Sequence, residues 1–204
     1  MSYLAGESAH PRAWTDDAVG AVGVLLRALH DATVDFIPPS RAHWQQTWIH
    51  DLPTVGGDVV FGHGDTGPWN IVGPDGRPAA FVDWSTAGPI DRVWELAQTV
   101  WLNAHLHDDD IAERLGLPDA AARARQAKAI LDGYRLPSAD RDEFVDRLVD
   151  VAIHSARAEA LDVTSDSTAA VTADGYPLLW AITWRTRSAS WIARHRALLR
   201  RTIR

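Results

Sequence analysis

Three polar side chains between residues 62 and 91 have the types and the spacing needed for chemistry on a phosphate group. Asp65, Asn70 and Asp83 lie in a segment rich in glycine and proline. The amide oxygen of Asn70 and the carboxylate of Asp83 are ligands that a hard cation such as Mg²⁺ prefers. Asp65 sits on a short glycine-containing loop, where a carboxylate can act as a base. A base and two cation ligands are the groups that phosphoryl transfer needs.

A predicted β-hairpin positions two of these three side chains. Short apolar strands are expected at residues 71–72 and 79–82, on either side of Pro74-Asp75-Gly76, which is a turn sequence. A turn near residues 75–77 makes the numbers of paired residues sum to about 152–153, which puts Asn70 opposite Asp83. Opposed side chains have Cβ atoms about 4.5–5.5 Å apart. We therefore expect Asn70 and Asp83 to share one cation.

Most of the remaining chain has the apolar periodicity of helices. A further strand is expected at residues 59–61, and residues 34–57 and 162–176 are expected to be loops. The predicted fold is mainly α with a small β-hairpin region (α+β), in which residues 1–14 form a lead-in and residues 15–204 the main lobe. Helices are expected over residues 15–33, 90–105, 109–115, 119–134, 137–161 and 178–203.

The order of residues around the hairpin resembles that of the aminoglycoside phosphotransferase family. This kinase-like group includes choline kinases and bacterial antibiotic kinases. The resemblance rests on His63-Gly64-Asp65, then Asn70, then Asp83-Trp84, with Gly88-Pro89 and Asp91 after them. Residues 25–30 resemble the helix that precedes the catalytic loop there, and residues 3–7 resemble the hinge between the two lobes. The resemblance covers nearly the whole chain and is sharpest over residues 60–97.

The resemblance implies an ATP-dependent phosphotransferase. Asp65 would take or orient the proton of a hydroxyl group on a small-molecule acceptor. Asn70 and Asp83 would hold Mg²⁺ on the phosphates of ATP, which is the co-substrate. The implied fold is a protein-kinase-like C-terminal lobe.

The resemblance also implies supporting roles for three further residues. His63 and Asp91 would brace the catalytic loop, and Val72 would contribute to the floor of the adenine pocket. Asp91 has an alternative interpretation, because an aspartate at the start of a predicted helix can cap it.

The segment before the catalytic loop departs from the family pattern. Only 62 residues precede His63, and the single lysine of the chain is Lys128. The chain therefore resembles the C-terminal lobe without most or all of the N-terminal lobe, whose strand lysine grips the phosphates. Two functions stay open: a phosphotransferase present as a truncated lobe, and a non-catalytic small-molecule-binding or regulatory, immunity-type lobe. In either case a separate N-lobe or a second copy could cover the exposed lobe interface.

Composition excludes several classes of protein. The chain has 204 residues and no cysteine, so disulfides and thiol chemistry are excluded, and a cytoplasmic location is expected. The formal net charge of −7 disfavours nucleic-acid binding and suits a cationic acceptor. No apolar run reaches the length of about 18 residues that a membrane span needs.

Other conspicuous groups favour structural interpretations. His105 and His107, followed by three aspartates, could suggest a metal site, but a solvated helix start is the preferred interpretation. Tryptophans 180, 184 and 191 have helical spacing and are expected in the core. The arginines of the last helix are expected to pair with acidic helices of the same chain rather than with nucleic acid.

Overall fold

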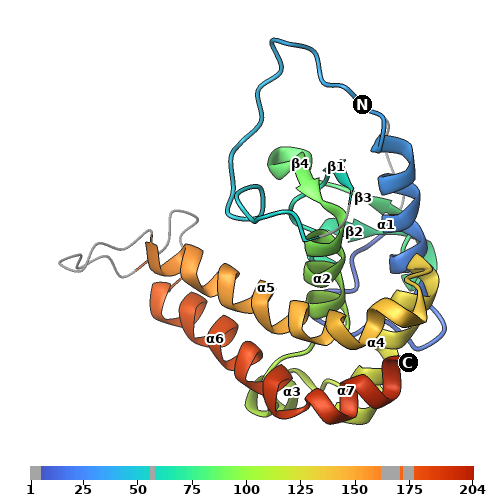
Figure 1. Ribbon diagram of the computed structural model, residues 1–204. Helices are drawn as coiled ribbons and strands as arrows, with labels where there is room; N and C mark the ends of the chain where they lie inside the picture. The colour runs from blue at the N-terminus through green and yellow to red at the C-terminus, as the bar shows by residue number, and fades with distance from the viewer. Residues whose placement is uncertain (1–5, 56–57, 162–170, 172–176) are drawn as a thin grey trace.

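The computed structural model describes residues 6–55, 58–161, 171 and 177–204, and it is mostly helical. Figure 1 shows two small antiparallel sheets packed against a set of helices. The helices are α1 (Gly20–Thr33), α2 (Arg92–Asn103), α3 (Asp109–Leu115), α4 (Ala120–Tyr134), α5 (Arg141–Leu161), α6 (Leu178–Arg194) and α7 (Arg196–Ile203). This architecture confirms the prediction of a mainly α fold with a small β region.

Two pairs of short strands lie at one end of α2. One sheet pairs β1 (Val59–Gly62) with β4 (Gly88–Asp91), and the other pairs β2 (Ile71–Val72) with β3 (Ala80–Phe81). Strand β4 falls where the sequence pattern predicted the start of a helix. Single-turn 3₁₀ helices occur at Pro68–Asn70, Pro74–Gly76, Trp84–Thr86 and Ser138–Asp140.

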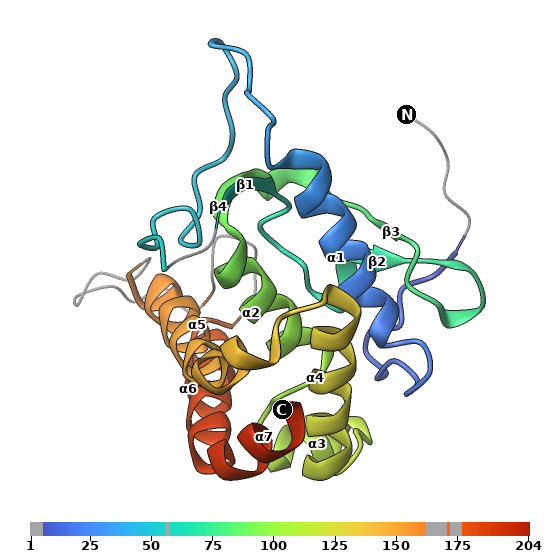
Figure 2. The same cartoon turned by 45° about the vertical axis from the view of Figure 1, so that its right-hand side comes forward.

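Helix α2 lies at the centre of the molecule, where ten of its twelve residues are buried. It contacts α5 on one side and α1 and α4 on the other, and α5 and α6 run side by side (Figures 1 and 2). The close approach of α1 and α4 requires glycine, because a Cβ on Gly23 would overlap the carbonyl oxygen of Ile130. The largest fully buried side chains include Leu26, Ile71, Trp101, Leu131 and Trp191.

Residues 34–55 form the irregular loop that the sequence predicted, and it extends from α1 to the neighbourhood of the sheets (Figure 2). The prediction for residues 162–176 falls outside the described residues, apart from residue 171. The last helix differs from its prediction, because it ends at Arg194 and resumes at Arg196. None of the helices in the described part of the chain is long and apolar enough to cross a membrane.

The C-terminal arginines pair within the chain, as predicted. Arg187 and Arg194 both contact Asp108 at 2.8 Å, and Arg200 contacts Asp146 at 2.7 Å. Asp108 also caps α3. Among the described residues there is no group of three or more His, Cys, Asp or Glu side chains that could hold a metal ion.

His105 and His107, which lie in the segment between α2 and α3, are buried rather than solvated. Arg123 donates from Nη1 to the carbonyl oxygens of His105, at 3.1 Å, and His107, at 2.7 Å. The Nδ1 atom of His107 lies 3.3 Å from the hydroxyl of Ser188. Burial is the main cause that lowers the pKa of His105 to about 4 and that of His107 to about 3.

These two histidines are expected to make the fold sensitive to acid. Between pH 6.5 and about 4 they bind protons in the unfolded chain but stay neutral in the folded one, so stability falls as the pH falls. Each histidine is expected to lower the free energy of unfolding by up to about 1.4 kcal/mol for every pH unit that the pH falls in this range. Urea unfolding at pH 7 and pH 5 measures the effect. His107→Asn is expected to reduce the pH dependence, and His43→Asn, on an exposed loop, is expected to leave it unchanged. An unchanged pH dependence in His107→Asn would contradict this assignment.

Candidate functional site

The loop that follows β1 places Asp65 and Asn70 in direct contact. Asp65 is half-buried, and its Oδ2 accepts hydrogen bonds from Nδ2 of Asn70 at 2.9 Å and from Nε1 of Trp69 at 3.0 Å. Nδ2 of Asn70 also donates to the carbonyl oxygen of Asp65 at 3.0 Å. Because these bonds use the N–H groups of the Asn70 amide, its oxygen is left as an acceptor for a cation.

Asp83 lies beside Asn70, one position away from the predicted register. The strands pair Ile71 with Phe81 and Val72 with Ala80, and the N–H of Val82 donates to the carbonyl oxygen of Asn70 at 2.9 Å. Asn70 is therefore opposite Val82, and the prediction that it is opposite Asp83 is wrong by one residue.

Asp83 is exposed, and the regular strand backbone ends at this residue. Asp83 has φ 59° and ψ 74°, in the left-handed region, and follows β3 directly. Its Oδ1 accepts hydrogen bonds from the hydroxyl of Ser85, at 2.7 Å, and from the Ser85 N–H, at 3.4 Å. The hydrogen bonds from Ser85 hold the pKa of Asp83 below its usual value. An ionised carboxylate and an amide oxygen next to the ends of two paired strands form a donor set that suits Mg²⁺.

His63 joins the loop that carries Asp65 to the strand that precedes Asp83. Its Nε2 donates to the carbonyl oxygen of Val82 at 2.9 Å, and its Nδ1 accepts from the N–H of Asp65 at 3.3 Å. Its buried ring packs against Phe81 and Trp84 at centroid distances of 5.2 Å and 4.7 Å. These contacts are of the kind expected for a residue that braces the loop.

The hydrogen bonds of Asp91 and the strand pairing of Val72 involve residues outside the loop of residues 63–70, which is called the catalytic loop below. Asp91 caps α2 by accepting from the N–H of Val93 at 2.8 Å, and its other oxygen accepts from the N–H of Val55 at 2.8 Å. Its hydrogen bonds within the described residues thus go to α2 and to the loop before β1. Val72 is half-buried in β2, where it pairs with Ala80.

The catalytic loop is braced by Glu95, which the sequence analysis did not single out. Oε1 of this fully buried glutamate accepts from the N–H of Gly64 at 2.7 Å, and Oε2 accepts from Nε2 of His30 at 2.7 Å. The other ring nitrogen of His30 lies 2.7 Å from the hydroxyl of Tyr134. Burial by itself would raise the pKa of Glu95, but the hydrogen bonds and charge of its partners outweigh it and lower the pKa.

Three further polar residues of α2 extend this contact along the loop. Gln98 accepts from the hydroxyl of Thr66 at 3.2 Å and donates to the carbonyl oxygen of Gly64 at 3.3 Å. Thr99 donates to the Thr66 hydroxyl at 2.7 Å, and Asn103 donates to the Thr66 carbonyl oxygen at 2.8 Å. Residues 95, 98, 99 and 103 share one face of the helix, and this polar spacing within an apolar helix was the signal available in the sequence.

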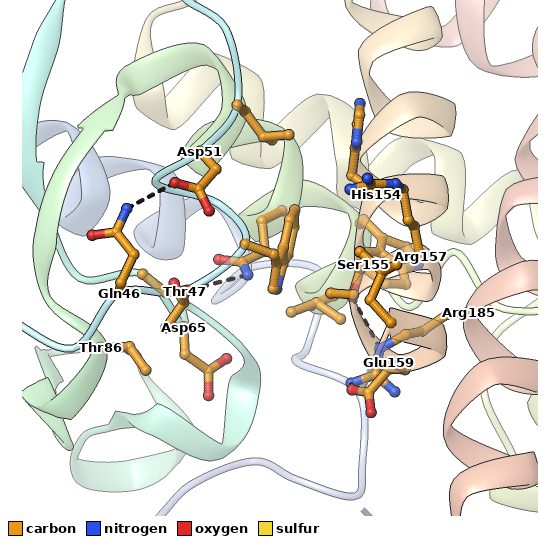
Figure 3. Close-up of a pocket in the computed structure, with 18 of the residues that line it drawn as sticks. Gln46, Thr47, Asp51, Asp65, Thr86, His154, Ser155, Arg157, Glu159 and Arg185 are labelled. Atoms are coloured by element: carbon orange, nitrogen blue, oxygen red, sulfur yellow. Dashed lines mark hydrogen bonds and ion pairs between the residues drawn. The ribbon is translucent and has the colours of Figure 1, made fainter. Parts of the chain in front are cut away.

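A pocket of about 620 Å³ opens beside Asp65. Figure 3 shows the loop of residues 45–53 and the catalytic loop on one side of it, and α5 and α6 on the other. Gln98 and Trp101 of α2 contribute to its lining. Asp65 belongs to the pocket wall, whereas Asn70 and Asp83 do not. Asp65 therefore lines the pocket and also contacts Asn70, one of the two candidate cation ligands.

The family model of the phosphotransferase enzyme family, APH, matches residues 40–144, so the chain belongs to this family. This confirms the resemblance found in the sequence.

Two individual proteins are similar to this chain. It is 47% identical over 201 residues to a trifolitoxin immunity protein of Rhizobium leguminosarum bv. trifolii, an alignment that covers 98% of this chain and 74% of that protein. Among solved structures it is similar to an ethanolamine kinase of Plasmodium vivax, with a TM-score of 0.44 and 12% identity. That alignment covers 93% of this chain, which spans 63% of the kinase.

Proposed function

We propose that this protein transfers a phosphoryl group from ATP to the hydroxyl of a small molecule bound in the pocket beside Asp65. The observation that carries the proposal is the position of Asp65, which lines the pocket and hydrogen bonds to Asn70. A group in this position can contact both an acceptor and a nucleotide. Membership of the phosphotransferase family supports the same reaction.

The donor atoms of Asn70 and Asp83 fit Mg²⁺. Magnesium prefers oxygen ligands and is usually held by one or two side chains together with phosphate oxygens and water. The amide oxygen of Asn70 and the free oxygen of Asp83 supply such ligands. Bound Mg²⁺ would neutralise charge on the phosphates during transfer.

Asp65 is proposed to accept the proton of the acceptor hydroxyl. Its Oδ2 is already held by Trp69 and Asn70, which leaves Oδ1 for the acceptor. As the acceptor oxygen bonds to the γ-phosphorus, the bond from that phosphorus to the leaving oxygen of ADP breaks. Glu95 and His63 act as positioning residues, because they accept hydrogen bonds from the backbone N–H groups of Gly64 and Asp65, respectively.

Contacts to the rest of the nucleotide are proposed to come from a second lobe. The single lysine of the chain, Lys128, lies on α4 and pairs with Asp132 at 3.1 Å, and neither residue lines the pocket. The second lobe would belong to the same polypeptide or to a separate chain, with Val72 in the floor of the adenine site. We also propose a cytoplasmic location, where ATP is available.

A second candidate function is binding without transfer. The relative that is 47% identical is named an immunity protein, and the pocket could hold a toxin-like small molecule without modifying it. The two functions differ in whether Asp65 is needed, so a comparison of the wild type with Asp65→Asn distinguishes them.

Titration with Mg·ATP in a calorimeter tests the nucleotide part of the proposal. Asp83→Asn is expected to weaken binding at least about tenfold, because it removes the charge of one cation ligand. Asp75→Asn is the matched control, since Asp75 is exposed in the same hairpin and also has a positive φ, which asparagine tolerates. Equal affinity in wild type and Asp83→Asn would contradict the assignment of this ligand. Absence of binding in the wild type would favour the second candidate function.

A further inference from the structure

The two sides of the pocket carry different charges. The catalytic loop and the loop of residues 45–53 contribute the carboxylates of Asp65 and Asp51 (Figure 3). Across the pocket, α5 and α6 contribute Arg157 and Arg185, and Glu159 is the acidic residue beside them. A ligand that spans the pocket therefore meets acidic groups at one end and guanidinium groups at the other.

Arg185 is held in a fixed orientation at the pocket wall. Its Nη2 pairs with Glu159 at 2.7 Å, its Nε donates to the hydroxyl of Ser155 at 2.9 Å, and its Nη1 donates to the carbonyl oxygen of Ala181 at 2.9 Å. The side chains of Arg185 and Glu159 are 19% and 20% exposed. A guanidinium has five N–H donors, so donors remain for a ligand after these contacts.

Arg185 lines the same pocket as Asp65 and packs against aromatic side chains. Its guanidinium lies 4.5 Å from the ring centroid of Trp184, which stacks on Trp101 at 5.3 Å. Burial lowers the pKa of Arg185, while the negative charges of Glu159 and Asp65 oppose that shift. The contacts with Glu159, Ser155 and Ala181 therefore hold Arg185 at the pocket wall, where its remaining N–H groups are available to a ligand.

Arg157 supplies the uncompensated positive charge of this wall. It is exposed on α5, and its guanidinium has no hydrogen bond or ion pair with another side chain in the described part of the chain. Glu159 neutralises Arg185, so the charge of Arg157 remains for a ligand. Guanidinium groups bind carboxylates through paired, charge-assisted hydrogen bonds.

We propose that the acceptor is a hydroxylated compound with a carboxylate group, which Arg157 and Arg185 bind while its hydroxyl contacts Asp65. This substrate class rests on the phosphotransfer proposed above. Trp101 and Trp184, which also line the pocket, would cover the apolar part of such a ligand.

Matched pairs of hydroxylated acids and their primary amides test this proposal. The probes are N-acetylserine, N-acetylthreonine and 3-(4-hydroxyphenyl)propionic acid, each compared with its amide by calorimetry and by quenching of tryptophan fluorescence. In the wild type, at least one acid is expected to bind about tenfold more tightly than its amide. Arg157→Gln is expected to remove most of this preference, and so is Glu159→Gln combined with Arg185→Gln. The double variant avoids leaving a buried, unpaired carboxylate.

Arg125→Gln is the matched control, because Arg125 is an exposed helical arginine with no described partner and lies outside the pocket. It is expected to keep the preference for the acid. The proposal is overturned if no acid binds, if acids and amides bind equally, or if the preference survives both pocket variants. Loss of Mg·ATP affinity in Arg157→Gln, with the acid preference unchanged, would assign the guanidinium groups to the nucleotide phosphates instead. Mg·ATP binding that depends on Asp83 would leave the proposed function intact even if no probe binds.

Discussion

Replacing Glu95 by alanine is expected to lower the free energy of unfolding by about 3–5 kcal/mol, the range for removing one partner of a buried pair. The substitution leaves the N–H of Gly64 and the Nε2 of His30 buried without their acceptor. It also leaves a cavity beside β1. Urea denaturation followed by circular dichroism at pH 7 measures the change.

Two further variants separate the hydrogen bonds of Glu95 from its charge. Glu95→Gln keeps the size and one acceptor oxygen, so its loss is expected to be smaller, about 1–3 kcal/mol. Glu113→Ala, an exposed glutamate on α3, is expected to change stability by less than about 0.5 kcal/mol. A loss below about 1 kcal/mol in Glu95→Ala would show that the catalytic loop does not depend on this residue.

The contribution of Glu95 is expected to depend on pH in a defined direction. Its folded pKa lies below the usual value, so its stabilising effect is present at neutral pH and is lost as the pH falls through the folded pKa. The difference in stability between wild type and Glu95→Gln should therefore shrink in acid.

Asp65→Asn is expected to lower the rate of phosphoryl transfer by about 10²–10⁴-fold, the usual contribution of a general base. Asparagine keeps the shape and can still accept hydrogen bonds from Trp69 and Asn70, so the affinity for Mg·ATP is expected to stay within about threefold of the wild type. ADP release in the presence of acceptor measures the rate. Asp35→Asn, on an exposed loop, is the control and should retain full activity. An Asp65→Asn protein as active as the wild type would exclude Asp65 as the base.

The same variant separates the two candidate functions. Bacteria that are sensitive to trifolitoxin would be tested for protection by the wild type and by Asp65→Asn. If protection requires transfer, the variant is expected to lose it. If the protein only binds the toxin, the variant is expected to protect as well as the wild type, and the phosphotransfer proposal would then fail for that role.

The family of this protein could be recognised from the amino-acid sequence alone, and so could the residues proposed to form its site. The order of His63, Asp65, Asn70 and Asp83 is a property of the chain, so it could be recognised without coordinates. Apolar periodicity likewise predicted most helices, because a helix buries one face and its pattern is local. The pairing of the C-terminal arginines followed from charge in the same way.

Features that depend on contacts between distant segments could be seen only in the folded chain. Strand β4 has little strand character of its own and forms by pairing with β1, which lies about thirty residues earlier. The turn of the hairpin has a left-handed backbone at Asp75, and the register that forms pairs Ile71 with Phe81. This register differs by one residue from the predicted one, so Asn70 is opposite Val82 and not opposite Asp83. At His195 the helical pattern continues although the helix breaks, and there the ring stacks on Trp191 at 4.1 Å.

The support of the site and its pocket also required the folded chain. In the sequence, Glu95 is one of several polar residues of a predicted helix. Its hydrogen bonds with His30 and Gly64 form only in the folded chain. The pocket is lined by six separate parts of the chain, and Asp65 and Arg185 lie on opposite sides of it only when α6 packs on α5. Local patterns specify elements because each element buries its own face, whereas a site formed from several elements is set by how those faces meet.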